Sequence, residues 1–200
     1  MGRALQSLAA AAAALALAAA PLGAGAEEAG FGDDGFGGSI DPWYAGAEAC
    51  ALLPGSGSRI GPAFAQAVFA GFQIDDAWAA EARGLCAPAA KASGRRGNAA
   101  LWGAGARVLW YFGLDLIGYE RFAPCLHFGV DVFGAKRRMF DGGRCAAAGP
   151  SAGLDLYWHL DDNWSVRASA GMAFLAGSHV ETVATAGIGL AFSWGGTEGE

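Results

Sequence analysis

Charged residues are scarce in this 200-residue chain, and no long apolar run follows its first 26 residues. Asp, Glu, Lys and Arg make up 16% of the sequence, whereas about 25% is typical of soluble domains. Every later apolar stretch is interrupted by Gly, Asp, Glu or Arg, so none reaches the roughly 18 residues that indicate a membrane-spanning helix. If residues 1–26 are removed on export, the remaining chain therefore either stays in solution outside the cytoplasm or crosses a membrane by an architecture other than a helix.

Sequence motifs of common chemistry are also missing. There is no P-loop, no dinucleotide-binding fingerprint in a strand–helix context, no GxSxG and no CxxC or Cys/His metal spacing. We therefore predict no cofactor, no metal site and no catalytic residues. The formal net charge, −6 for the whole chain and −7 once residues 1–26 are removed, argues against nucleic acid as a partner.

The N-terminus has the pattern of a secretory signal peptide. Arg3 provides a positive charge, an uninterrupted apolar run follows from Leu8 to Ala20, and small residues precede a cleavage site after Ala26. This run is too short to be a membrane anchor. Residues 27–41 are acidic and Gly-rich, and they are predicted to form a flexible leader.

Glycine and aromatic residues favour β-structure. The chain has 33 Gly, more than twice the usual share of about 7%, and Gly weakens helices. Aromatic residues make up 12%, and several should mark the ends of membrane strands as an interfacial girdle. The candidates for this girdle are Trp43, Tyr44, Trp78, Trp110, Tyr111, Phe112, Trp158, Trp164 and Trp194.

Eight segments show the two-residue alternation of a β-strand. Their lengths suit tilted crossings of a bilayer, and short turns alternate with longer Gly/Pro/Ser-rich loops, as in outer-membrane barrels. The long loops are basic and the short turns are acidic, which indicates that the two ends of the predicted barrel differ in charge. The predicted strands are 43–53, 65–74, 78–86, 99–112, 122–133, 151–160, 164–174 and 182–194.

One face of these strands is apolar, and the other combines a few charges with many small residues. Few, nearly balanced charges suit a narrow lumen in which ion pairs satisfy one another. The interior of an eight-stranded barrel is filled by side chains, so a wide pore is not expected. A soluble, lipocalin-like barrel that binds a small apolar ligand remains an alternative. The predicted lumen charges are Glu48, Glu81, Arg83, Arg107, Asp131, Asp155 and Arg167, with Gln73 and His159 on the same face.

The segment GLDLYWHLDDNWSVRASAGMAF, residues 153–174, resembles the penultimate hairpin of small outer-membrane barrels of the OmpA-like, OmpX-like and opacity type, and the segment GIGLAFSW, residues 187–194, resembles their closing strand. This resemblance covers residues 42–194 and implies an all-β, eight-stranded antiparallel up-and-down transmembrane β-barrel in the bacterial outer membrane. Residues 195–200 would form a C-terminal tail.

The remaining predictions concern partners and cysteines. Lys136, Arg137, Arg138 and Arg144 are candidates for contacts with lipopolysaccharide phosphates. Four Cys in an oxidising compartment indicate disulfides, and three pairings are possible; Cys50 with Cys86 is preferred, leaving Cys125 and Cys145.

The sequence predicts a monomeric, non-enzymatic barrel with a structural or surface-interaction role. Its expected partners are outer-membrane lipid, lipopolysaccharide and the outer-membrane insertion machinery. A barrel enzyme acting on lipid A or phospholipid is the alternative function, although no nucleophile motif supports it.

Overall fold

The described part of this computed structural model contains only β-structure and its connections. No helix within that part is long and apolar enough to cross a membrane. The predicted signal peptide, leader and C-terminal tail lie outside the described residues. These residues are 43–55, 60–75, 77–91, 98–112, 122–136, 140, 143–161, 163–177 and 180–194.

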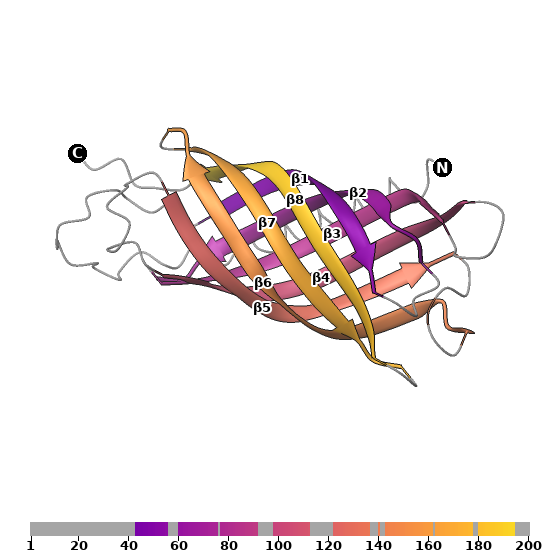
Figure 1. Cartoon of the computed structure of the whole chain (residues 1–200). Coiled ribbons are helices and arrows are strands. Elements are labelled where there is room, and N and C mark those ends of the chain that lie inside the picture. The colour runs from indigo at the N-terminus through magenta and orange to yellow at the C-terminus, as the bar shows by residue number, and fades with distance from the viewer. Residues whose placement is uncertain are drawn as a thin grey trace, which may run out of the picture.

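Eight antiparallel strands form one closed barrel, in which each strand pairs with its sequence neighbour and β8 pairs with β1 (Figure 1). Closure leaves no free sheet edge. The predicted eight-stranded barrel is thereby confirmed. The strands are β1 (Trp43–Pro54), β2 (Ala63–Gln73), β3 (Trp78–Lys91), β4 (Asn98–Tyr111), β5 (Phe122–Ala135), β6 (Ala146–His159), β7 (Trp164–Leu175) and β8 (Glu181–Trp194).

Two strands extend further towards the long loops than the sequence predicts. The two-residue alternation predicts that the third strand ends at Cys86 and that the sixth begins at Ser151, although β3 continues past Pro88 and β6 begins before Pro150. In the structure β3 pairs with β2 only as far as Cys86, and β6 pairs with β7 only from Ser151. Each proline therefore lies beyond the end of one neighbouring ladder, where its missing N–H costs no ladder hydrogen bond.

The two short turns that open β3 and β7 have the same construction. The Oδ1 atom of Asp75 accepts hydrogen bonds from the backbone N–H groups of Ala77 and Trp78, each at 2.8 Å. Asp161 Oδ1 accepts from Asn163 N and Trp164 N, at 3.0 and 2.7 Å. These aspartates replace missing backbone partners and fix where the next strand begins.

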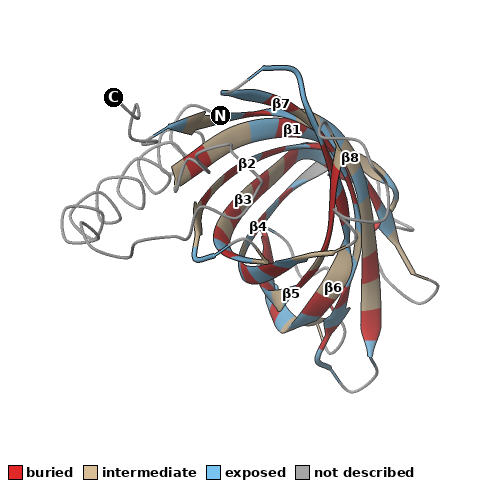
Figure 2. Ribbon diagram, turned by 90° about the vertical axis from the view of Figure 1, so that its left-hand side faces the viewer, coloured by how far each residue is buried: buried red, intermediate tan, exposed pale blue. Residues whose placement is uncertain are grey.

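The barrel is apolar on the outside. Burial alternates residue by residue along the strands, as the banded ribbons of Figure 2 show. Large apolar side chains such as Phe128, Val130, Leu154 and Ile188 face outwards, and Val130 is 55% exposed. A soluble barrel would bury these groups. The lipocalin-like alternative is therefore wrong, and the apolar face is a lipid-contacting belt.

Aromatic side chains collect on the outer surface at the end with the short turns. Neighbouring strands contribute the pairs Trp43–Phe72, Trp78–Trp110, Phe122–Trp158 and Trp164–Phe192, with ring centroids 4.7 to 6.2 Å apart. Tyr44 and Tyr111, two of the girdle candidates, instead pack inside the barrel because period two places them on the inward face.

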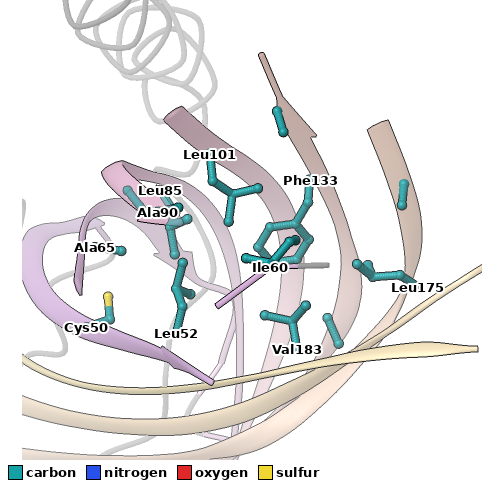
Figure 3. Close-up of a cluster of buried hydrophobic side chains, with 14 of the residues drawn as sticks. Cys50, Leu52, Ile60, Ala65, Leu85, Ala90, Leu101, Phe133, Leu175 and Val183 are labelled. Atoms are coloured by element: carbon teal, nitrogen blue, oxygen red, sulfur yellow. The ribbon is translucent and has the colours of Figure 1, made fainter. Parts of the chain in front are cut away.

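The lumen has three layers between the turn end and the loop end. At the turn end, Tyr44, Phe69, Tyr111 and Tyr157 belong to an aromatic cluster. Charged side chains occupy the middle of the barrel. At the loop end, an apolar cluster includes Leu52, Leu101, Phe133, Leu175 and Val183, which point towards one another from different strands (Figure 3).

A belt in contact with lipid predicts a depth-dependent cost for an added charge. We expect Val130→Arg, in the middle of β5, to destabilise the barrel by about 2–4 kcal/mol. Leu160→Arg, at the β6–β7 turn, is the matched control and should cost only about 0–1 kcal/mol. Urea unfolding in phospholipid vesicles measures both values, and equal costs at the two positions would contradict the belt.

Candidate functional site: the charged lumen

Arg167 is the centre of the charged layer. Its guanidinium contacts Glu81 through two hydrogen bonds, Nη1–Oε2 at 2.7 Å and Nη2–Oε1 at 3.1 Å. Because β7 and β3 are four strands apart in a barrel of eight, this pair joins opposite walls. Nη2 also donates to Asp155 Oδ2 at 2.9 Å. Arg167 and Asp155 are both completely buried, so these contacts replace solvation.

The turn-end aromatic layer also contacts Arg167. Its guanidinium carbon lies 4.3 Å from the ring centroid of Phe69 and 5.4 Å from that of Tyr157. A cation over an aromatic face is attracted to the ring, more strongly where water is excluded. The aromatic layer therefore stabilises the charge as well as filling the lumen.

Glu48 joins β1 to this centre. It forms an ion pair with Arg83 and accepts a hydrogen bond from Ser169 Oγ at 3.2 Å. Its Oε2 lies 4.0 Å from Arg167 Nε. The Cys50 thiol donates to Glu48 Oε1 at 3.3 Å. Strands β1, β3 and β7 are thus linked through one buried carboxylate.

Two more pairs lie between adjacent strands on the other side of the lumen. His127 Nδ1 lies 2.8 Å from Asp155 Oδ2, which connects β5 to β6. Arg107 Nη2 donates to Asp131 Oδ2 at 3.2 Å, between β4 and β5. The structure therefore gathers all seven predicted lumen charges into one layer. It adds His127, which sequence reasoning missed although period two places it on the same face as Asp131.

Glycines on the inward face make room for these side chains. A Cβ atom at Gly105 would collide with the Asp131 carboxylate, and one at Gly153 would collide with the His127 ring. Such a clash forces a shift of the charged group, which the fixed register leaves little room for. The high glycine content thus reflects the close fit of the lumen as well as strand geometry.

Gln73 and His159 lie apart from the charged layer, at the turn ends of β2 and β6. Gln73 Nε2 donates to the Asp75 carbonyl at 2.7 Å. His159 Nδ1 is 2.8 Å from Ser165 Oγ. This Ser–His contact is not an assembled catalytic site, since Ser165 is only 3% exposed and no carboxylate among the described residues pairs with His159.

The predicted disulfides are not formed in the structure, where all four cysteines are free. The preferred pair is wrong for a geometric reason. Cys50 faces the lumen, whereas Cys86 lies on the outward face of β3, opposite Gln66 of β2. A disulfide requires Cβ atoms that approach each other, which residues on opposite faces of the wall do not provide. Cys125 is buried at the turn end, and Cys145 is exposed at the loop end.

Basic residues of the loop end are only partly described. Lys136 and Arg144 are exposed, and Arg144 Nη2 donates to the Ala176 carbonyl. Arg137 and Arg138 lie outside the described residues. The structure thus describes two of the four residues that are predicted to contact lipopolysaccharide, and both lie at the loop end of the barrel.

A closed eight-stranded barrel with an apolar outside and a charged, filled inside is the architecture of small outer-membrane proteins. This chain is a barrel of that class, as the sequence predicts, and its belt and girdle locate it in the bacterial outer membrane.

Particular solved structures share this fold. The Neisserial surface protein A, NspA, aligns with a TM-score of 0.54 and 16% identity over 76% of this chain and 97% of that chain. The outer membrane protein OprG from Pseudomonas aeruginosa gives 0.55 and 10% over 78% and 98%. Ail, the attachment invasion locus protein of Yersinia pestis, gives 0.51 and 13% over 76% and 97%. No protein-family model and no curated protein matches the chain.

Removing the central cation should be strongly destabilising. Arg167→Ala removes the guanidinium that contacts Glu81 and leaves Asp155 with His127 alone, which should cost about 3–5 kcal/mol. Arg167→Lys keeps the charge but loses the two-pronged contact, so an intermediate loss is expected. Urea unfolding in vesicles, read by the change in gel mobility on heating, measures both variants. A loss below about 1 kcal/mol for Arg167→Ala, as for solvent-screened pairs, would contradict this arrangement.

Proposed function

We propose that this chain is an outer-membrane barrel that neither conducts ions through a wide pore nor catalyses a reaction, and that acts structurally or through contacts at its loop end. The observation that carries the proposal is the filled lumen. The Arg167–Glu81 pair crosses the barrel from wall to wall, and an apolar layer that includes Phe133 and Phe140 lies between this pair and the loops.

The proposal includes a route to the membrane. Residues 1–26 would direct export and be removed after Ala26, and the insertion machinery of the outer membrane would assemble residues 42–194 into the barrel. Residues 27–41 would remain on the mature chain as a leader.

A role at the cell surface gains support from two features. Two proteins of the same fold are named as a surface protein and an attachment invasion protein. The loops between the strands carry Lys136, Arg137, Arg138 and Arg144. One guanidinium group can donate two parallel hydrogen bonds to two oxygens of a phosphate. We therefore propose lipopolysaccharide phosphates as the ligand of this basic cluster.

Conductance measurements test the filled lumen. The purified barrel, reconstituted into planar lipid bilayers, should give no stable channel steps, because ions would have to separate buried pairs in a low-dielectric interior. A general porin in the same membrane is the positive control. Stable steps of porin size from the barrel would overturn the proposal.

Lipopolysaccharide binding tests the basic cluster. Replacing Lys136, Arg137 and Arg138 together by Ser should weaken association with lipopolysaccharide micelles, and the loss should be larger at low salt because these charges are solvent-screened. Arg121→Ser, which removes a base from the segment of sequence between β4 and β5, is the matched control and should change nothing. Unchanged association of the triple variant would reject phosphate contact by these residues.

A further inference from the structure

A small cavity lies between the charged layer and the apolar layer of the lumen. Its volume is about 20 Å³. Arg83, Arg107, His127, Asp131 and Ser151 provide polar lining, and apolar residues that include Leu85, Phe133 and Val183 line the loop side. A space of this size holds about one water molecule.

Four side chains that line the cavity have polar atoms without a hydrogen-bond partner among the described residues. These atoms are Arg83 Nε, Arg107 Nε and Nη1, His127 Nε2 and Ser151 Oγ. Each of the four residues is at least nine-tenths buried. Buried polar groups in folded proteins are nearly always hydrogen-bonded, either to protein or to an ordered molecule, so these atoms point to an occupant.

The chemistry of the occupant follows from the atoms that lack a partner. The guanidinium nitrogens can only donate, and the hydroxyl can donate or accept. His127 Nδ1 donates to Asp155, so Nε2 of the neutral ring is an acceptor. The group that completes them must therefore accept several hydrogen bonds. A cavity of about 20 Å³ suits a single water molecule or a monatomic anion.

We propose that this cavity is a binding site for one small hydrogen-bond acceptor, either a water molecule or a halide ion. The acceptor would connect the Arg107–Asp131 pair to His127, and through His127 to Asp155 and Arg167. The pair on β4 and β5 would then become part of the network that crosses the barrel. The site depends on the lumen alone and does not require a role for the loops.

A high-resolution crystal structure of the full chain, grown with sodium bromide, tests this proposal. We expect a density peak within hydrogen-bond distance of Arg107 and of either His127 or Ser151. Anomalous signal from bromine at this peak identifies a halide, and a peak without it identifies water. A cavity without density would overturn the proposal.

Solution measurements separate a halide site from accidental occupancy. If a halide binds, unfolding in vesicles should shift to higher urea in sodium bromide than in sodium glutamate of equal ionic strength, because a ligand of the folded state stabilises it. If bromine gives an anomalous peak in the crystal but the urea midpoint does not shift, the bromide is an adventitious ion only. This outcome overturns the halide assignment, and water is then the occupant in solution.

Two serine variants show whether the occupant depends on the cavity wall. Ser151→Ala removes one donor, so the peak should weaken, and for a halide the concentration giving half-occupancy should rise roughly 2- to 12-fold, the effect of one hydrogen bond. Ser169→Ala is the matched control, since Ser169 bonds to Glu48 and does not line the cavity. Equal loss of the peak in both variants would contradict the assignment of Ser151 to the site.

Discussion

The buried guanidinium of Arg167 is the group on which the rest of the lumen depends. A charge that is completely removed from water is stable only if partners replace its hydration. Glu81 and Asp155 provide those partners from β3 and β6, and Phe69 and Tyr157 cover its turn-end side. Because Glu81 lies on the opposite wall, the pair requires a closed barrel of this diameter. The ion pair and barrel closure thus stabilise each other.

The carboxylates around Arg167 extend this dependence to β1 and β5. Glu48 connects Arg83 and Ser169 to the centre, and Asp155 connects His127. Arg107 and Asp131 form a separate pair, for which the proposed acceptor would be the link. Inward glycines leave the space that these side chains fill. Seven of the 32 Asp, Glu, Lys and Arg residues of the chain lie in this interior layer, and the outer belt carries the contact with lipid.

The turn end and the loop end of the barrel have different roles, and this difference follows from the filled lumen between them. The turn end has tight aspartate turns, outward tryptophans and an inward aromatic layer, so it is the more regular end. The loop end combines an apolar lumen layer with basic loops. With the lumen filled, contacts with other molecules are left to the outer surface and to the loops. This is why the proposed function assigns contacts with other molecules to the loop residues and not to the interior.

The sequence by itself determined the strand number, the two faces of each strand and the end at which the short turns lie. These properties are local, since period two, turn residues and aromatic positions are read within one segment. Only the tertiary structure decided which charges pair, because partners such as Glu81 and Arg167 are far apart in sequence and meet across a closed barrel. It also extended β3 and β6 past their prolines, which depends on where a neighbouring ladder ends and is not encoded by any single segment. The inward face of His127 and the opposite faces of Cys50 and Cys86, in contrast, follow from period two once the strand limits are known.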